Sequence, residues 1–414
     1  MRGAKKAMQK TEKKAPELRF QGFTDDWEQR KLGDVFEQTV EYVDPAKEGL
    51  ELWSLTVEKG LTPKTNRYNR DALVKKNDKF KVVYPGDIVY NPMNMTIGAV
   101  GFNNTDIKVT VSGYYVTMNM KSNFDNKYFK TWLPSPPALN IYKNYATGSL
   151  IEKQRIQFPT LSSIRIALPK SKEQAKIGAY FHQLDNTIAL HQRKLDFLKD
   201  LKKAYLQQLF PQNNNSKPSL RFDSFDGDWE QRKLGELSEI VRGASPRPIQ
   251  DPKWFDDESN IGWLRIADVT EQNGRIYHLQ QKISIVAQEK TRVLLEPHLL
   301  LSIAATVGKP VVNYVKTGVH DGFLIFLNPQ FEQEYMFQWL EMFRPLWSKY
   351  GQPGSQVNLN SELVKNHELV IPENDEQVKI GNFFKNLDDN ISLHQKKLDE
   401  LKEIKSAFLQ KMFI

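Results

Sequence analysis

The sequence contains no cysteine, and this absence removes several classes of site. Disulfide bonds, thiolate nucleophiles and cysteine-ligated zinc are all excluded. The seven histidines are scattered without any HExxH-like pairing, so we expect no metal centre. No apolar run approaches the roughly 20 residues that span a bilayer, and residues 1–14 lack the apolar core of a signal peptide. We therefore expect a cytoplasmic protein with no membrane partner.

Motifs for catalysis and cofactor binding are also missing. The sequence has no Gly-rich cofactor loop, no GxxxxGK[ST] and no [DN]PP[FY], the motif of adenine methyltransferases. The stretch Asn91-Pro92-Met93-Asn94 lacks the second proline and the aromatic residue that this last motif requires. We expect no catalytic residue and no bound cofactor in this chain.

The composition that remains is that of a folded protein of two or three domains. Its 414 residues are 40% hydrophobic, 11% aromatic and 26% charged. The 58 basic residues outnumber the 50 acidic ones, which is compatible with a polyanionic partner, because each neutralised phosphate releases a condensed counterion. Six of the basic residues lie within residues 1–14, and we interpret residues 1–15 as a solvated basic tail.

Two segments of the sequence occur twice. The stretch PELRFQGFTDDWEQRKLGDV begins at Pro16 and returns as PSLRFDSFDGDWEQRKLGEL from Pro218. A second stretch begins at Pro169 and returns from Pro372, and both copies contain EQxKIGxxFxxLDxxIxLHQxKLDxLK. The offsets are 202 and 203 positions, so the chain consists of two nearly equal halves.

The segments between these repeats are less alike but keep some correspondence. Pro85 matches Pro297, a Thr-Ile/Val-Gly triplet recurs, and Gly113 matches Gly322. Short β-branched and aromatic runs bounded by Gly, Pro and Asn predict strands at Asp87–Tyr90, Tyr114–Met118, Trp263–Ile266 and Phe323–Leu327. The two halves therefore share a mixed α and β fold while differing in surface.

The second repeat predicts two long helices. Its apolar positions alternate in steps of four and three, which is the seam of a coiled coil. The seam residues are Ile177, Phe181, Leu184, Ile188, His191, Leu195, Leu198, Lys202, Tyr205 and Leu209, and then Ile380, Phe384, Leu387, Ile391, His394, Leu398, Leu401, Lys405, Phe408 and Met412. Leu190, Leu201, Leu393 and Ile404 widen the stripe, so each helix can contact more than one neighbour. An amphipathic helix packed on its own domain is the alternative, but about 37 residues span roughly 55 Å, more than one domain needs.

The short linker at residues 211–217 favours an antiparallel pairing of these helices. A parallel pairing would require the chain to retrace about 55 Å, which so few residues at about 3.3 Å each cannot span comfortably. The matching histidines His191 and His394 are interpreted as polar residues that set the helix register.

These features resemble the specificity subunit of type I restriction-modification enzymes. The two WEQRKLG modules, the paired helices and the two variable segments carry the resemblance, which covers the chain after about Ala15. It implies an α+β fold with two mixed α/β target recognition domains, related by pseudo-twofold symmetry and separated by two long antiparallel coiled-coil helices. The expected divisions are residues 16–168 and 218–371 for the domains, and 169–210 and 372–414 for the spacer helices.

The resemblance also implies a role and a set of partners. Each domain is expected to read one half of an asymmetric, interrupted target in double-stranded DNA. The helices are expected to bind two modification subunits, which use S-adenosylmethionine, and two restriction subunits, which use ATP and Mg, join the complex. The specificity subunit itself is not catalytic and carries no cofactor.

Polar side chains on loops are the candidates for base reading, because arginine recognises guanine and asparagine or glutamine recognises adenine. In the first half these are Lys64, Asn66, Arg67, Tyr68, Asn69, Arg70, Asn91, Asn94, Thr96 and Ser149. In the second half they are Arg242, Ser245, Arg247, Thr306, Lys309, Ser355, Gln356 and Asn358.

Other functions are consistent with parts of the pattern. A bipartite DNA-binding transcriptional regulator without enzyme partners would share the repeated domains and the spacer. A self-sufficient methyltransferase is disfavoured by the missing motifs, and a coiled-coil scaffold by the large domains. Copurification with methyltransferase subunits, or tight operator binding by the chain alone, separates the first two functions.

Overall fold

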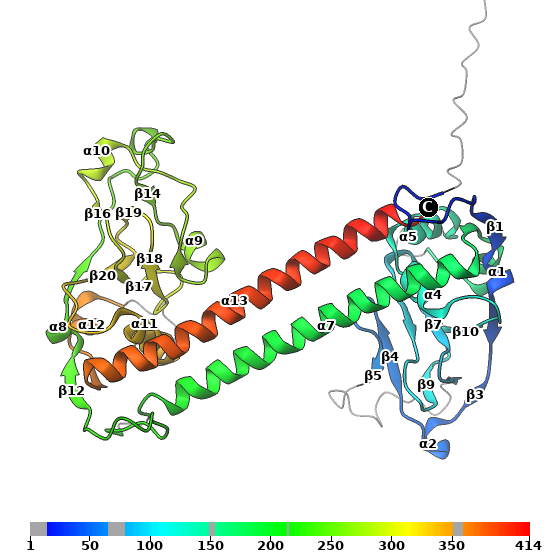
Figure 1. Cartoon of the computed structure of the whole chain (residues 1–414), viewed down its shortest axis with the longest axis horizontal. Coiled ribbons are helices and arrows are strands. Elements are labelled where there is room, and N and C mark those ends of the chain that lie inside the picture. The colour runs from blue at the N-terminus through cyan, green and yellow to red at the C-terminus, as the bar shows by residue number, and fades with distance from the viewer. Residues whose placement is uncertain (1–14, 65–78, 149–153, 213–214, 351–358) are drawn as a thin grey trace, which may run out of the picture. The chain divides into compact units, whose positions relative to one another are not determined.

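The computed structural model describes residues 15–64, 79–148, 154–212, 215–350 and 359–414, and the chain divides into two compact units (Figure 1). Unit 1 consists of residues 1–192 and 396–414, and unit 2 consists of residues 193–395. Each unit therefore contains one variable segment together with parts of both long helices.

Unit 1 is built on a four-stranded antiparallel sheet in the order β2-β10-β7-β8. Its strands are β2 (Phe36–Thr39), β10 (Val116–Met120), β7 (Ile88–Tyr90) and β8 (Val100–Phe102). The strands predicted at Asp87–Tyr90 and Tyr114–Met118 are confirmed, although β10 begins two residues later because Gly113–Tyr115 forms the preceding turn.

Smaller sheets and short helices surround this sheet. The strands are β1 (Glu28–Lys31) with β11 (Arg165–Leu168), β3 (Tyr42–Val43) with β6 (Phe80–Val83) and β9 (Val109–Ser112), and β4 (Trp53–Thr56) with β5 (Gly60–Pro63). The helices are α1 (Leu32–Val35), α2 (Pro45–Glu48), η1 (Met95–Ile97), α4 (Asn126–Trp132), α5 (Pro136–Tyr145) and α6 (Phe158–Ser163). Asp125 and Ser135 cap α4 and α5 through their side-chain oxygens, as expected for helix N-termini.

Unit 2 repeats this plan with an additional strand. Its main sheet has the order β13-β20-β17-β18-β15. These strands are β13 (Glu239–Arg242), β20 (Phe323–Leu327), β17 (Leu299–Ser302), β18 (Pro310–Asn313) and β15 (Arg275–Ile276). The strand predicted at Phe323–Leu327 is confirmed.

The remaining elements of unit 2 form two smaller sheets and several short helices. The strands are β12 (Glu230–Lys233) with β21 (Glu368–Ile371), and β14 (Gly262–Trp263) with β19 (Thr317–Val319) and β16 (Arg292–Leu294). The helices are α8 (Leu234–Leu237), η3 (Pro252–Trp254), α9 (Ile266–Glu271), α10 (Ile285–Gln288), α11 (Gln333–Phe343), η4 (Arg344–Tyr350) and α12 (Ser361–Lys365). The strand predicted at Trp263–Ile266 is wrong in its second half, because Asp268 accepts a hydrogen bond from the backbone of Arg265 and α9 begins at Ile266.

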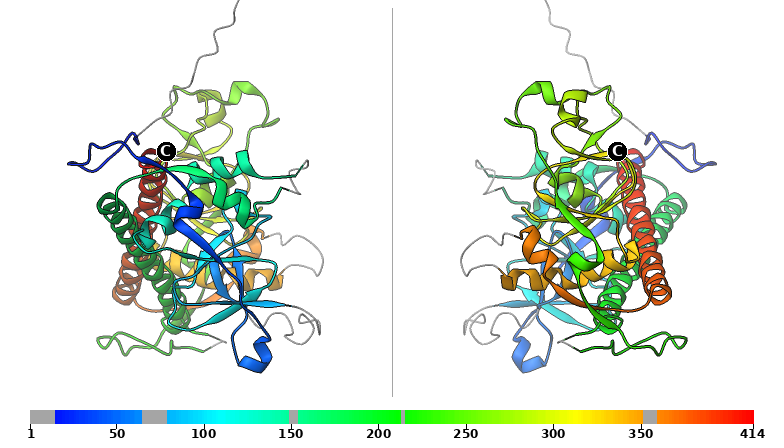
Figure 2. Two further views of the ribbon diagram at one scale, coloured as in Figure 1. Left: turned by 90° about the vertical axis from the view of Figure 1, so that its right-hand side faces the viewer. Right: turned by 90° about the vertical axis from the view of Figure 1, so that its left-hand side faces the viewer.

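Alternating residues along the central strands separate two hydrophobic cores in each unit. In unit 1, Ile88 and Tyr90 face the core that contains α4 and α5, while Val89 faces the core beneath the smaller sheets. In unit 2, Leu299 and Leu301 face α11, while Leu300 faces the side of α9 and β19. This alternation follows from the two-residue period of a strand, and both units are therefore three-layered. In unit 2 a third, smaller core lies around Trp263. The yellow-green segment around α10, labelled in Figure 1, extends away from α11 (Figures 1 and 2).

The two long helices are α7 (Ser171–Gln208) and α13 (Asn374–Lys411), each of 38 residues. Within unit 1, the rings of Tyr180 and Phe408 lie 5.6 Å apart, and Lys405 contacts Asp185 at 2.5 Å. Within unit 2, the ring of Tyr205 lies 5.0 Å from that of Phe383, and Lys202 contacts Asp388 at 2.5 Å. In each unit, a residue further along α7 contacts a residue with a lower number on α13. The two helices are therefore antiparallel in both units.

The α+β class, the two repeated mixed domains and the antiparallel coiled-coil helices are thus confirmed. The pseudo-twofold relation between the domains stays a prediction. None of the helices in the described part of the chain is both long and apolar enough to cross a membrane. Among the same residues, no group of three or more His, Asp or Glu side chains is placed to hold a metal ion. His191 and His394 are half-buried at their seam positions.

Candidate nucleic-acid interface

One end of the main sheet in unit 1 gathers three segments that are distant in sequence. Thr39 at the end of β2 pairs with Thr117, and Tyr90 at the end of β7 pairs with Val116. The segment after β2, the loop after β7 and the turn Gly113–Tyr115 before β10 therefore meet at this end. Loops at the end of a rigid sheet are a common position for binding residues.

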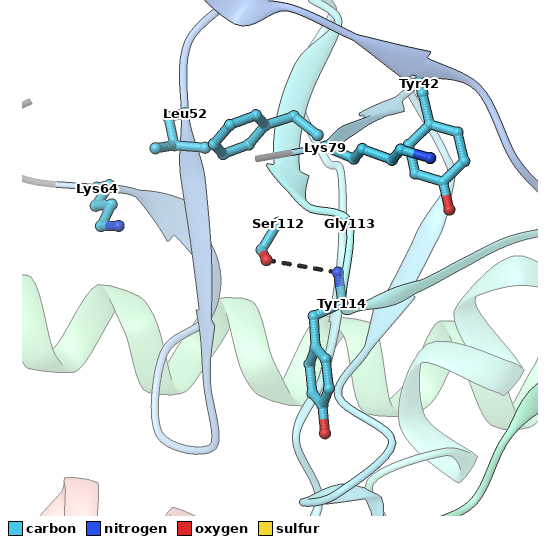
Figure 3. A pocket seen from close by; sticks show the side chains of 8 residues that line it. Tyr42, Leu52, Lys64, Lys79, Ser112, Gly113 and Tyr114 are labelled. Carbon is cyan, nitrogen blue, oxygen red and sulfur yellow. Dashed lines mark hydrogen bonds between the residues drawn. The ribbon is translucent and has the colours of Figure 1, made fainter. Parts of the chain in front are cut away.

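A concave site of about 440 Å³ opens beside this turn (Figure 3). Its lining combines aromatic and basic side chains: Tyr42, Leu52, Lys64, Lys79, Phe80, Ser112, Gly113 and Tyr114. The rings of Tyr42 and Tyr114 are about half exposed, and the Lys79 ammonium lies 5.5 Å from the centroid of the Tyr42 ring. Aromatic faces beside cations suit nucleobases and phosphates respectively.

Lys81 supports this site from behind. Its side chain is buried, and its Nζ donates a hydrogen bond to the carbonyl oxygen of Tyr115 at 2.6 Å. Burial lowers the pKa of this lysine below its ordinary value. The bond fixes the end of the turn that carries Tyr114.

The structure describes four of the ten residues predicted for DNA contact in the first half. Lys64 lines the concave site. Asn91, Asn94 and Thr96 lie on the loop between β7 and β8, at the same end of the sheet, and the Asn91 side chain accepts a hydrogen bond from the backbone of Met93. The others lie outside the described residues: Asn66, Arg67, Tyr68, Asn69, Arg70 and Ser149.

Unit 2 has a cluster of arginines around Asp321 in the corresponding region. The two carboxylate oxygens of Asp321 accept hydrogen bonds from Ser245 Oγ at 2.8 Å and from Arg247 Nη2 at 2.6 Å. Arg242 Nε donates to the carbonyl oxygen of Asp321 at 2.6 Å, and Arg292 Nε donates to that of Arg242 at 2.8 Å. Three of the predicted residues, Arg242, Ser245 and Arg247, are therefore brought together by a residue that the sequence did not single out.

The electrostatics of this cluster favour an ionised carboxylate. Burial raises the pKa of Asp321, but the hydrogen bond from Ser245 and the charges of Arg247 and Arg242 lower it overall, below its ordinary value. Arg242, Arg247 and Arg292 are all exposed, so the cluster presents net positive charge to solvent.

The remaining predicted residues of the second half have different positions. Thr306 lies on the loop after β17 and donates a hydrogen bond to Ser302 Oγ at 3.1 Å. Lys309 is buried, and its ammonium contacts Asn273 and Glu341, so its charge is neutralised inside the unit. Ser355, Gln356 and Asn358 lie outside the described residues.

Strand register places the concave site and the arginine cluster at equivalent points of the two units. In unit 1, Tyr90 pairs with Val116, which is the first residue after the turn. In unit 2, Ser302 pairs with Phe323, which is likewise the first residue after its turn. The three-residue turns at 113–115 and 320–322 therefore correspond, and Tyr114 occupies the position of Asp321. Gly113 and Gly322, matched by sequence, lie in the same turn but two positions apart.

The adjoining strands agree with this correspondence. Phe80 pairs with Ser112 at the end of β9, and Arg292 pairs with Val319 at the end of β19. Sequence reasoning missed Tyr42, Lys79, Tyr114, Arg292 and Asp321, because these residues become neighbours only through strand pairing. In the sequence, the matched glycines Gly113 and Gly322 were the one indication of this turn.

The repeated EQxKIG motif fixes the segment that precedes β1 or β12 to the start of a long helix. Arg19 binds Glu173 through two hydrogen bonds of 2.6 and 2.7 Å. Arg221 binds Glu376 in the same way, at 2.7 and 2.6 Å. Both carboxylates are buried, and Trp229 of the WEQRKLG module also donates to Glu376 at 3.1 Å. Paired, bidentate contacts of this kind hold a buried carboxylate in one orientation.

The glutamine of the motif links the helix to the domain. Gln174 Nε2 donates to the carbonyl oxygen of Pro169 at 2.8 Å, and its Oε1 accepts from the backbone of Asp125 at 3.2 Å. Gln377 makes the equivalent bonds in unit 2, both of 2.8 Å. Each glutamine thus joins the preceding loop to the N-terminus of a domain helix.

The glycine of the motif permits a close helix crossing. A Cβ atom at Gly178 would lie 2.5 Å from the backbone nitrogen of Tyr128 in α4, and one at Gly381 would lie 2.8 Å from that of Tyr335 in α11. No side chain fits at such distances, so each long helix touches the start of a domain helix. The motif therefore fixes each long helix against α4 in unit 1 or α11 in unit 2.

Residues 24–200 and 226–403 match the family described as the type I restriction modification DNA specificity domain. The chain belongs to this family. The two matches coincide with the two copies of the repeat, and the role that defines the family is DNA specificity rather than catalysis.

Curated relatives and a solved structure agree with the family over nearly the whole chain. The putative type I restriction enzyme MjaX specificity subunit of Methanocaldococcus jannaschii is 21% identical, with 93% of this chain and 92% of the relative covered. The MjaVIII specificity subunit of the same organism is 20% identical, with 93% and 91% covered. The crystal structure of a type I S subunit from M. genitalium has a TM-score of 0.64 at 15% identity and covers 97% of this chain and 99% of that one, which shows the shared fold.

Proposed function

We propose that this chain reads an interrupted, asymmetric DNA target, with one unit for each half-site. The observation that carries the proposal is the strand-register match between the concave site of unit 1 and the arginine cluster of unit 2. An equivalent position holds Tyr114 in one unit and Asp321 in the other. One fold with two different surfaces suits two different sequences, because base edges are recognised by the chemistry of individual side chains.

The long helices are proposed to hold the two half-site readers apart and to bind two modification subunits. Leu190 and Phe197 on α7, and Leu393 and Ile404 on α13, are exposed apolar side chains. Leu190 and Leu393 are equivalent in the repeat, and each is more than half exposed. Exposed apolar residues on a helix are a typical protein-binding surface. Two copies of such a surface support the binding of two copies of one partner.

Methylation and cleavage are proposed to belong to partner subunits. The modification subunits would use S-adenosylmethionine, and two restriction subunits would use ATP and Mg. This chain would then supply the target sequence and the assembly surface alone, inside the cell.

A domain exchange tests the one-unit, one-half-site proposal. Residues 36–146 are replaced by the variable segment of a relative, the chain is assembled with its modification subunits, and methylated adenines are mapped by sequencing. We expect one half of the target to change while the other half and the gap stay the same, because the units should not share base contacts. A change in both half-sites would contradict the proposal.

Titration calorimetry with S-adenosylmethionine tests the division of labour. We expect no micromolar binding to the purified chain, and methylation only after the modification subunits are added. Stoichiometric copurification with those subunits supports the proposal. Tight binding of the chain alone to an operator would instead favour a DNA-binding regulator.

A further inference from the structure

Within the proposed function, we infer that Arg247 reads a guanine in the half-site of unit 2 and that Asp321 positions it. A guanidinium carries five N–H donors in a fixed plane. Two of them match the O6 and N7 acceptors that guanine presents in the major groove. The bond to Asp321 occupies one donor of Arg247, and 73% of its side chain is exposed. The rest of the plane is therefore open to a ligand.

Asp321 is suited to the positioning role because it is itself fixed on several sides. One carboxylate oxygen accepts from Ser245 and the other from Arg247, while Arg242 holds the carbonyl of the same residue. An arginine held before binding loses less side-chain entropy when it meets a base. The positive charges of the cluster also outweigh its one carboxylate, so the cluster does not repel DNA.

Unit 1 provides a second, independent observation. Tyr114 occupies the position of Asp321, and Phe80 that of Arg292. The described lining of the unit 1 site contains tyrosines and lysines in place of arginines. The side chains at equivalent positions of the two units therefore differ in chemistry around this arginine, as expected for a position that sets DNA sequence specificity.

Arginine also binds phosphate, and the two ligands produce different substitution profiles. A phosphate contact weakens binding to every sequence and lowers the salt dependence by about one unit of slope. A guanine contact affects one base pair, where loss of the arginine removes a discrimination of about 10- to 100-fold.

The experiment compares the wild-type complex with Arg247→Ala on all single-base-pair variants of the target. The half-site of unit 2 is the one that survives the exchange of residues 36–146. We expect it to contain a G·C pair that the wild type requires about 10- to 100-fold over other pairs and that the variant no longer distinguishes, with all other positions unchanged. Arg165→Ala, an exposed arginine of unit 1, is the matched control and should keep the wild-type profile.

Asp321→Asn tests the positioning role. It should reduce discrimination at the same base pair, and it should have little further effect in the Arg247→Ala background. Uniform weakening by Arg247→Ala, an unchanged profile, or a half-site without G·C overturns the inference while the target itself remains defined. A wild-type complex that methylates no defined sequence overturns the proposed function as well.

Discussion

Single side chains give the equivalent turns of the two units their different chemistry, and His320 is one of them. The turn of unit 2 begins with this histidine, whose ring lies 5.8 Å from Trp263 and 4.8 Å from Phe323 between centroids. Its Nδ1 accepts a hydrogen bond from the backbone nitrogen of Gly322 at 2.9 Å. Protonation at Nδ1 would break this bond, so the turn depends on a neutral imidazole.

This dependence predicts a pH effect on unit 2. Burial lowers the pKa of His320 below its ordinary value, although Asp321 acts to raise it. Because the folded state keeps this imidazole neutral, its contribution to stability is complete above the pKa of about 6.5 that histidine has in the unfolded chain. This contribution is lost as the pH falls from there toward the lower pKa of the folded state. Between pH 7.5 and 5.5 we expect the unfolding free energy of unit 2 to fall, measured by urea denaturation.

Matched variants identify the histidine responsible. His320→Asn keeps an acceptor for Gly322 and should reduce the pH dependence. His278→Asn replaces an exposed histidine of the same unit and should leave it unchanged. Equal pH dependence in the wild type and in His320→Asn would contradict the prediction.

At the scale of elements, the contacts of the EQxKIG motif join the segment before β1 or β12 to a long helix. The Glu376 carboxylate is fully buried and the Arg221 side chain is 17% exposed. Removing one member of a buried ion pair leaves the other charge without compensation and typically costs about 3 kcal/mol or more. Arg221→Ala should destabilise unit 2 by about that amount, measured as a shift in its denaturation midpoint.

Arg232 provides the control for this prediction. It pairs with Glu236 on the surface of the same unit, with side chains 37% and 51% exposed, and such pairs contribute at most about 0.5 kcal/mol. Similar effects from Arg221→Ala and Arg232→Ala would show that the buried pair does not secure the helix.

The two long helices could be predicted from sequence because their apolar periodicity is a local property. The seam positions identified α7 and α13, and short β-branched and aromatic runs bounded by Gly, Pro and Asn identified β7, β10 and β20. The strand predicted at Trp263–Ile266 failed where the side chain of Asp268 starts a helix, a local contact that periodicity does not record.

The candidate site was less predictable from sequence because it depends on neighbours from distant segments. Arg242, Ser245 and Arg247 were selected as loop residues, but Asp321, which joins them, lies more than 70 positions away. Lys309 was selected as a loop cation, yet it is buried against Glu341. Sequence therefore indicated the loops, and strand register was needed to determine which side chains meet.

At the scale of the whole molecule, the proposed role of the long helices predicts that they set the spacing between the two half-sites. Inserting one heptad near Leu195 and one near Leu398 keeps the apolar seam and adds about 10 Å to each helix. That length corresponds to about three more base pairs of gap. Three pairs also rotate the second half-site by about 100°, so some affinity should be lost.

Methylation profiles on targets with gaps from the natural length to about five pairs longer measure this effect. The heptad variant should prefer the longer gap. A two-residue insertion is the control and should impair assembly as well, because it moves the apolar stripe off the seam. Methylation of the natural gap alone, at the original rate, would show that the helices do not set the spacing.

The C-terminal part of α7 belongs to unit 2 and the C-terminal part of α13 belongs to unit 1. This division constrains the order in which the two units can complete folding during synthesis. The core of unit 1 includes Met412 and Phe413, and the ring of Phe413 lies 5.5 Å from that of Tyr128. A ribosome releases these residues only after it has made all of unit 2. Unit 1 therefore emerges first but cannot complete its core until translation has passed residue 413, whereas Leu209 and Phe210 of unit 2 precede the rest of its core. A nascent chain arrested before that point lacks Met412 and Phe413 in the core of unit 1, so completion of this core depends on residues made after the whole of unit 2.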